Sequence, residues 1–516
     1  MFYRILAVCV LLSLLGFSAP APPNASTPSL DAQTPAEQEV LRQLSAGKEA
    51  DLTKLPQGQR TVRAAFLKQL LSASSQGQGG SLTLIGAEIP DAFLAGGSNE
   101  SMDVPMNLKL ENCHFAAAFQ CNGCHFHASV AFHRCRFDDG LHLQNSQVDG
   151  DMLLTQNVTE VQAKEKAHAV FLRGSHVTGL LSIQQPRGTA VSIGAANTSA
   201  GNIDINLTDS GRVRILNLAN VSTGHLTIFN NRPGSSHLKT LYINAVNVKN
   251  NLFLKNLAIE DLTARHITVG FQTEFSNLAI TNQLNLSAAT LDSFAFALAS
   301  QNDQPVWPKE IELDDFSFKS GAVTADAPKP PAKSDSNDVQ PADETPLPRD
   351  VTLEFLERAN YSQSAFTSYE TELTGEGRSH DAQEVFTQMH RARRRSDFKL
   401  ANPATWLTTL FDYFQEYFLG YGRSVVPPLV WSLVFIALGT LLFRGRDSMV
   451  AMDDKAPPFS PFWYSLETFL PVVDLGVGKS WRPRPSSPLV TYARLHQLAG
   501  WILIPVALAA ITGVVK

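Results

Sequence analysis

The strongest hydrophobic pattern in the chain repeats every eleven residues between Asn112 and Leu154. Each unit carries two apolar pairs, and one polar or small residue separates the members of a pair. A spacing of two is typical of β-strands, whose side chains alternate between two faces. The first pairs are Cys113/Phe115, Cys124/Phe126, Cys135/Phe137 and Ser146/Val148; the second are Phe119/Cys121, Val130/Phe132, Leu141/Leu143 and Met152/Leu154.

A unit of this length cannot bury an apolar face alone, whereas stacked units share a continuous interior. The pattern therefore predicts a mainly β protein, a parallel, right-handed β-helix or solenoid with two units per coil, over residues 79–320. Weaker pairs continue to about Phe318. Asn is common at the expected corners, where its tolerance of left-handed backbone is useful; these residues are Asn206, Asn217, Asn220, Asn244, Asn256, Asn277 and Asn285.

The N-terminal segment predicts export. Residues 1–21 combine a basic start at Arg4, an apolar stretch from Ile5 to Phe17 and small residues after it, which is typical of a signal peptide or a signal anchor. Residues 22–36 are rich in Pro, Ala, Ser and Thr and predict a flexible lead-in. Residues 37–78 show helical spacing and predict a cap over the first, unpaired edge of the solenoid.

After the solenoid, residues 321–350 are rich in Pro, Ala, Lys and Asp and predict a disordered linker. Residues 351–400 predict an αα-hairpin broken at Gly375-Glu376-Gly377. Its second helix ends in a basic cluster, for which two interpretations stay open: stabilisation of a helix C-terminus, or contact with anionic lipid headgroups. The side chains expected between the helices are Tyr369, Leu373, Val385, Phe386 and Met389, and the basic cluster is Arg391, Arg393, Arg394 and Arg395.

The C-terminal part predicts membrane association. Residues 401–422 predict an interfacial amphipathic helix, and 424–443 and 495–515 are apolar enough for two transmembrane helices. The intervening loop, 444–494, is rich in Lys and Arg, which places it in the cytoplasm by the positive-inside rule. Its apolar segment 462–475 is too short to span and predicts a re-entrant or interfacial element, with Glu467 and Asp474 as acidic candidates for function.

Several cysteines and histidines are close together in the first units, as in Cys121-Asn-Gly-Cys124-His125-Phe-His127. Strand alternation directs the cysteines inward, and it directs His114, His125 and His127 outward. Ligands on opposite faces cannot share one ion, so the pattern favours packing over a metal site.

A disulfide between Cys113 and Cys135 stays open, because these residues stack in adjacent coils about 4.8 Å apart. The outward acids Asp138, Asp139, Asp149 and Asp151 are interpreted as solvated corners, because no set of carboxylates converges in the sequence. We find no catalytic motif and no cofactor-binding motif. A net charge of −6 gives no indication of nucleic-acid binding.

The combination of these segments resembles bacterial pentapeptide-repeat-like membrane proteins with a C-terminal two-span module. The resemblance is carried by the segments 61–71 and 82–89, the Cys-x-Phe units, Tyr421-Gly422-Arg423 before the first span, and Ser465-Leu-Glu-Thr-Phe-Leu-Pro-Val-Val-Asp-Leu475. Some of these proteins are labelled membrane-associated oxidoreductases, and others are compared with two-span ion channels. The resemblance implies a membrane-attached solenoid.

Three functions follow as hypotheses. The favoured one is an envelope protein of the bacterial inner membrane, whose periplasmic solenoid binds or scaffolds a protein or a cell-wall polymer. The second is an oligomeric ion-channel-like protein that associates through its transmembrane helices and uses the solenoid as a sensor; residues 465–476 lie where a pore loop would, without a Gly-Tyr-Gly filter. The third is a polysaccharide-acting β-helix enzyme, for which the sequence identifies no catalytic residues.

Overall fold

The computed structural model describes residues 30–73, 80–97, 101–159, 169–188, 191–301, 304–325, 350–398, 402–445, 448–454, 456–470 and 472–512. The predicted signal segment, just over half of the lead-in and most of the linker lie outside these residues; the first five residues of the predicted linker, 321–325, instead belong to a strand. The chain divides into two compact units. The first contains residues 1–312 and 322–340, and the second contains residues 313–321 and 341–516.

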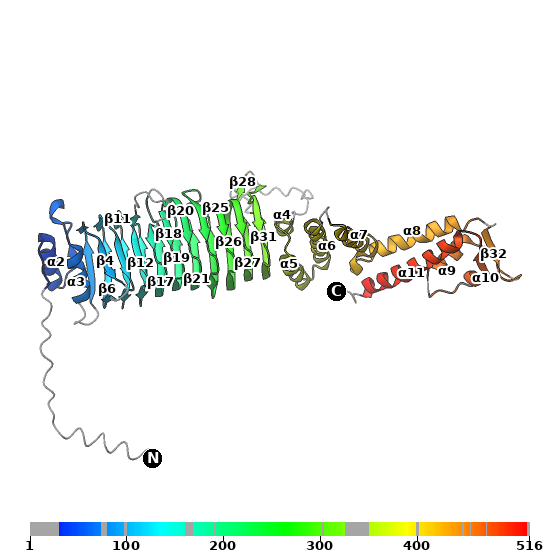
Figure 1. The fold of residues 1–516 in the computed structure, drawn as a ribbon, viewed down its shortest axis with the longest axis horizontal. Coiled ribbons are helices and arrows are strands. Elements are labelled where there is room, and N and C mark those ends of the chain that lie inside the picture. The colour runs from blue at the N-terminus through cyan, green and yellow to red at the C-terminus, as the bar shows by residue number, and fades with distance from the viewer. Residues whose placement is uncertain are drawn as a thin grey trace, which may run out of the picture. The chain divides into compact units, whose positions relative to one another are not determined.

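The first unit is a parallel β-solenoid of about ten coils, which confirms the predicted mainly β architecture (Figure 1). Val130 pairs in parallel with Leu108 of the preceding coil and with Met152 of the following one. Hydrogen bonds between adjacent coils join residues 22 apart, as from Cys135 N to Asn157 Oδ1. Two eleven-residue units therefore make one coil, as the repeat predicts.

The early coils have four short strands each. One coil contains β7 (His114–Phe115), β8 (Phe119–Asn122), β9 (His125–Phe126) and β10 (Val130–His133). Their neighbours are β1 (Ala50–Asp51), β2 (Ser81–Ile85), β3 (Glu88–Ile89), β4 (Phe93–Gly96), β5 (Asp103–Val104), β6 (Asn107–Glu111), β11 (Arg136–Phe137), β12 (Leu141–Gln144), β13 (Gln147–Val148), β14 (Met152–Thr155), β15 (Val158–Thr159) and β16 (Val170–Phe171).

In later coils adjacent short strands merge. The strand β17 (His176–Gln184) pairs with both β13 and β14, and β26 (Thr268–Asn285) is 18 residues long. The other strands are β18 (Val191–Gly194), β19 (Ser199–Asn206), β20 (Gly211–Asn217), β21 (Ser222–Phe229), β22 (Ser236–Tyr242), β23 (Asn247–Val248), β24 (Asn251–Lys255), β25 (Ala258–Thr263), β27 (Thr290–Leu298), β28 (Ser300–Gln301), β29 (Gln304–Pro305), β30 (Glu310–Glu312) and β31 (Ser317–Ala325).

The solenoid interior contains both members of each alternating pair between Asn112 and Leu154. Phe115, Phe119 and Phe137 are fully buried. Phe119 stacks on Phe93 with ring centroids 4.4 Å apart, and Phe115 stacks on Phe137 at 5.0 Å. The register of the strands produces this stacking of rings, because residues one coil apart lie directly above one another in a parallel ladder. Like side chains therefore form columns through the interior.

The corners need left-handed backbone at regular intervals. Asn112, Gly123, Arg134, Asn145 and Gln156 all have positive φ and are spaced eleven residues apart. Three of the predicted corner residues, Asn220, Asn256 and Asn277, also have positive φ. Others, Asn206, Asn217 and Asn285, instead accept a hydrogen bond from the backbone N–H two residues later. Asn therefore supports the corners in both of the ways its short amide allows.

Two helices precede the main strands: α2 (Pro35–Ser45) and α3 (Ala64–Ala73), with a 3₁₀ turn η1 (Gln57–Gln59) between them. Thr34 and Glu37 form a capping box at the start of α2. Glu37 is fully buried and forms an ion pair with Arg63 at 2.8 Å. This contact fixes the entry to α3 against the start of α2.

The second unit is helical. The predicted first helix of the hairpin is in fact two helices, α4 (Val351–Arg358) and α5 (Gln363–Gly375), because Ser362 caps a new N-terminus there. The second is α6 (Ser379–Asp397), and the predicted residues Tyr369, Leu373, Val385 and Met389 are buried. The remaining elements are α7 (Pro403–Phe414), a π-helical turn η3 (Gln415–Leu419), η4 (Gly420–Gly422), α8 (Val426–Leu442), α9 (Pro461–Phe469), α10 (Val477–Ser480), α11 (Leu489–Thr512) and the antiparallel pair β32 (Met449–Ala451) and β33 (Trp481–Pro483).

Among the described residues, α11 is long and apolar enough to cross a membrane. The 17-residue α8 meets that criterion only together with the preceding helical segment, from which it is bent by 105°. At 1.5 Å per residue α8 is about 26 Å long, slightly less than a hydrocarbon core of about 30 Å. Two transmembrane helices therefore remain a prediction.

Candidate functional site

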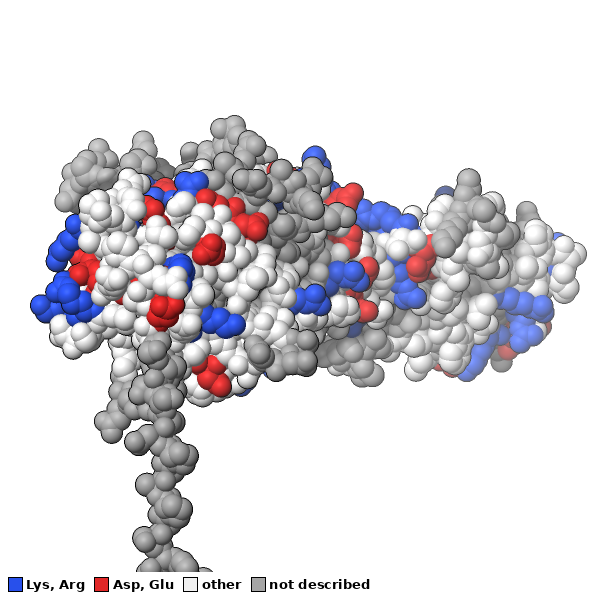
Figure 2. Space-filling model, turned by 60° about the vertical axis from the view of Figure 1, so that its left-hand side comes forward, with Lys and Arg blue, Asp and Glu red and all other residues white. Residues whose placement is uncertain are grey.

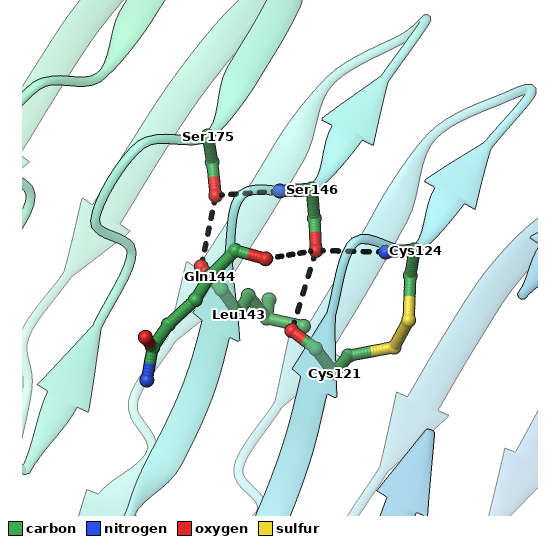
Figure 3. The surroundings of a disulfide bond; sticks show 6 residues. All are labelled: Cys121, Cys124, Leu143, Gln144, Ser146 and Ser175. Carbon is green, nitrogen blue, oxygen red and sulfur yellow. Dashed lines mark hydrogen bonds between the residues drawn. A yellow bond between two sulfur atoms is a disulfide. The ribbon is translucent and has the colours of Figure 1, made fainter. Parts of the chain in front are cut away.

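Three cysteines of the first coils lie at inner corner positions of the solenoid, namely Cys113, Cys124 and Cys135, whereas Cys121 lies on strand β8. All four are buried, and His114, His125 and His127 reach the surface, so the predicted alternation is confirmed. Cys121 and Cys124 form a disulfide (Figure 3). Around it, Ser146 Oγ accepts a hydrogen bond from Cys124 N and donates to carbonyl oxygens, while Ser175 repeats this role one coil later (Figure 3).

The structure does not join Cys113 to Cys135, the pairing that the sequence left open; both are buried free thiols. The two thiols nevertheless lie within hydrogen-bonding contact of each other. Each sulfur is directed at backbone carbonyl oxygens, from Cys113 to Leu84 at 3.5 Å and from Cys135 to Leu110 at 3.3 Å. The same corner position carries Ser146 and Asn157, which also bond to backbone there. These thiols therefore have the structural role of small corner donors.

The basic cluster at the end of α6 forms ion pairs within the helical unit. Arg394 pairs with Asp412 of α7 at 2.7 Å and with Glu416 of η3, whose side chain is 7% exposed. Arg391 pairs with the same Glu416 at 2.7 Å. His390 lies 3.2 Å from Asp412; burial lowers the pKa of this imidazole, although the carboxylate opposes the shift. Arg391 and Arg394 thus connect α6 to α7 and η3.

The other two arginines of the cluster are more accessible. Arg393 pairs with Asp397 one turn later on α6 at 3.3 Å. Arg395 is exposed and has no ion-pair partner among the described residues. Besides the two interpretations that the sequence left open, the structure shows a third role for this cluster, which is ion pairing between helices. Lipid contact remains a prediction, and only Arg393 and Arg395 are free enough for it.

The acidic candidates of the 462–475 segment have structural contacts. Glu467 of α9 accepts hydrogen bonds from the backbone N–H groups of Val477 and Gly478, each at 2.9 Å, and so caps α10. Asp474 is exposed and pairs with Lys479, which lowers the pKa of its carboxyl group. Both residues line an open cleft of about 760 Å³ that also includes Arg482.

The helix α9 packs tightly against α8 and α11. Ser465 of α9 is fully buried and donates a hydrogen bond to Ile436 O of α8 at 2.9 Å. His496 of α11 lies 3.0 Å from Ser465 O. A side chain at Gly439 or Gly500 would collide with α9 or α11 atoms. Small residues and polar contacts of this kind are typical of helix packing in membranes.

A cluster that the sequence analysis missed lies on the outer surface of the solenoid. Asp103 of β5, His125 of β9, and His127 and Asp149 just after β9 and β13 come from three successive coils. The Asp103 carboxylate lies 3.7 Å from His125 Nδ1 and 3.4 Å from His127 Nε2. The Asp149 carboxylate lies 2.9 Å from His125 Nε2 and 3.6 Å from His127 Nδ1. We call these four residues the His–Asp cluster.

The coil length was the signal that could have revealed this cluster. Adding one coil to Asp103 gives His125, and adding one coil to His127 gives Asp149. The four residues do not converge along the sequence, because a solenoid brings together residues that are 22 apart. Comparison of the chain with family models, with curated proteins and with solved structures gave no match. The cluster is therefore judged on its geometry alone.

Proposed function

We propose that this chain is an envelope protein anchored in the bacterial inner membrane, which presents its solenoid in the periplasm as a binding or scaffolding surface. The observation that carries the proposal is the distribution of exposed apolar side chains. Among the described residues, only three exposed large apolar side chains lie in the solenoid: Leu94, Tyr242 and Phe271. All others lie at or beyond Phe398 in the sequence.

The apolar surface of the helical unit supports membrane attachment. On α8 alone, Val426, Leu429, Leu433 and Leu441 are each more than half exposed. An apolar surface of this extent is unfavourable in water and matches a lipid environment. In the proposal α8 and α11 are the two spans, α7 lies at the interface, and α2 and α3 cap the first solenoid edge.

The solenoid, in contrast to the helical unit, has a mainly polar surface with few exposed large apolar side chains. On the face shown in Figure 2, acidic and basic side chains are interspersed among uncharged residues. Rigid, stacked coils that present regularly spaced polar side chains form an extended binding surface. Such a surface suits a protein or a cell-wall polymer as partner. A polysaccharide-acting enzyme would use the same fold, so turnover of the bound polymer would distinguish it.

Topology is the first test. We would place single cysteines at Ser320 and at Asp454, both exposed, in a background without the native cysteines, and treat intact cells with an impermeant thiol reagent. The proposal expects labelling at Ser320→Cys and protection at Asp454→Cys. Labelling only at Asp454→Cys would overturn it, since the solenoid would then be cytoplasmic. Lysed cells, in which both sites must react, are the control.

A second candidate is an oligomeric channel-like protein. The close packing of α9 against both α8 and α11 through Ser465 favours it, because a re-entrant helix has such contacts. Ion flux in vesicles that contain the purified chain would support this candidate. A Gly500→Leu variant, which displaces α9, is expected to abolish any such flux. Vesicles that show no flux with either protein would leave scaffolding as the function.

A further inference from the structure

The His–Asp cluster differs from an ordinary pair of surface ion pairs. The rings of His125 and His127 lie side by side, with centroids 3.8 Å apart. One carboxylate lies at each end of this ring pair: Asp103 faces His125 Nδ1 and His127 Nε2, and Asp149 faces the two opposite nitrogens. Each histidine therefore has one nitrogen directed toward Asp103 and the other toward Asp149.

The Asp103 side of the cluster has the donor set and the spacing of a metal site. One carboxylate oxygen and two imidazole nitrogens lie within 4.8 Å of one another. In a tetrahedral zinc site with bonds of about 2.0–2.1 Å, neighbouring donor atoms are about 3.3–3.4 Å apart. The distances from Asp103 to the two nitrogens, 3.4 and 3.7 Å, are close to this value.

Asp149 is placed to orient the histidines. Its Oδ2 lies 2.9 Å from His125 Nε2, a hydrogen bond that leaves Nδ1 of this ring with a lone pair toward Asp103. The other oxygen of Asp149 accepts a hydrogen bond from Gln147 Nε2 at 2.7 Å. Metal-binding histidines characteristically donate their second nitrogen to a carboxylate in this way.

The backbone holds the cluster in a fixed arrangement. His125 N and His127 N donate to carbonyl oxygens of the preceding coil at 2.9 Å, and Asp149 N donates to Phe126 O at 2.9 Å. The side chains of His125 and His127 are 29% and 43% exposed, so an ion can reach them from solvent. Ladder strands are more rigid supports for ligands than loops.

We propose that Asp103, His125 and His127 bind a divalent cation of the zinc class, with Asp149 as the outer-shell carboxylate. Two imidazoles with one carboxylate favour zinc and its neighbours in the transition series over calcium or magnesium, which prefer oxygen donors. Three protein ligands leave a fourth position for water or for an anionic oxygen atom. The site extends the proposed binding surface, and its existence does not depend on that function.

The test uses the full-length chain in detergent, stripped with a chelator and then dialysed against zinc alone. We expect about one zinc ion per chain by elemental analysis, and with cobalt(II) the visible absorption of a four-coordinate site. His127→Asn and Asp103→Asn are expected to lower zinc affinity by more than about 100-fold, and Asp149→Asn by about 10–100-fold. The three substituted side chains all reach the surface, and the circular dichroism of each variant shows whether it folds.

The matched control is His114→Asn. His114 is also exposed and also lies 2.9 Å from an aspartate, Asp138, but among the described residues no second histidine is paired with this aspartate. This variant is expected to bind zinc like the wild type. The proposal would be overturned if His127→Asn retained as much zinc as the wild type, if His114→Asn reduced binding equally, or if the wild type bound no zinc.

Discussion

The solenoid and the helical unit use apolar side chains in opposite ways. In the solenoid these side chains are inside, as the buried column around Phe119 shows, and the surface is polar. In the helical unit, α8 and α11 expose many of theirs, and buried polar groups such as Ser465 and Glu416 connect the helices. The hydrophobic effect explains the solenoid pattern directly, whereas the pattern of the helical unit fits the proposed contact with lipid.

The difference shows where stability is expected to come from. In the solenoid, burial of apolar area and the ladder of backbone hydrogen bonds are the main contributions. In the helical unit, ion pairs and hydrogen bonds between helices matter more, since exposed leucines gain nothing from burial within the chain. Four predictions test this comparison, from the largest expected effect on the free energy of unfolding to the smallest.

The largest effect is expected from Phe119→Ala. Phe119 is fully buried and contacts four other phenylalanine rings, so its removal leaves a cavity and should cost about 3–5 kcal/mol. Chemical denaturation followed by the circular dichroism of the β-strands measures this cost. The matched control is Phe271→Ala, at a site 64% exposed, where we expect a change below about 0.5 kcal/mol. Equal costs at both sites would contradict the assignment of the interior.

Arg394→Ala should destabilise the helical unit by about 2–3 kcal/mol, because it leaves Asp412 and Glu416 without their shared partner. We estimate less than for a fully buried pair, since Arg394 is still 11% exposed. Thermal unfolding followed by helical circular dichroism is the measurement. Arg395→Ala, one residue later and exposed, is the matched control and should be neutral. A neutral Arg394→Ala would show that the pairs contribute nothing.

The third prediction concerns Glu37 and pH. Burial opposes ionisation of this carboxyl, but hydrogen bonds from Arg63 and from backbone N–H groups outweigh it and lower its pKa from 4.5. The contribution of Glu37 to stability is therefore complete above pH 4.5 and is lost as the pH falls through the lower, folded-state pKa. Glu37→Gln should cost about 1–2 kcal/mol at neutral pH and progressively less in acid.

Denaturation of both proteins across this pH range measures the effect. A difference between wild type and Glu37→Gln that stays constant down to the most acidic pH would contradict the lowered pKa. Glu39→Gln is the control, because Glu39 lies on the same helix and pairs with Arg42 on the surface. Its substitution should have little effect at neutral pH.

The smallest effect on unfolding is expected at the apolar surface of α8. Leu433 is 61% exposed, so Leu433→Ala should change stability in detergent by less than about 0.5 kcal/mol. The proposed membrane contact should nevertheless make Leu433→Lys harder to insert, because a charge at this depth costs about 2.5–3.5 kcal/mol. Membrane fractionation measures the inserted share. Unchanged insertion of Leu433→Lys would place this face outside the lipid.

The sequence was sufficient for the regular features. The eleven-residue step predicted the strands, the parallel stacking, the two units per coil and the inward cysteines, because each of these follows from side-chain alternation and from the need to bury an apolar face. It also predicted that the hairpin residues Tyr369, Leu373, Val385 and Met389 are buried, because apolar residues at helical spacing lie on one face of a helix. It did not predict the break at Ser362, where a local cap outweighs continuing helical spacing.

Only the tertiary structure decided which side chains meet. The partner of Arg394 comes from another helix, the disulfide joins Cys121 to Cys124 while Cys113 and Cys135 are not joined, and Asp103 meets His125 and His127 across one coil. Periodicity determines the face on which a residue lies. The direction and distance of its polar atoms depend on register and rotamer, which become definite only when neighbouring coils and helices are in place.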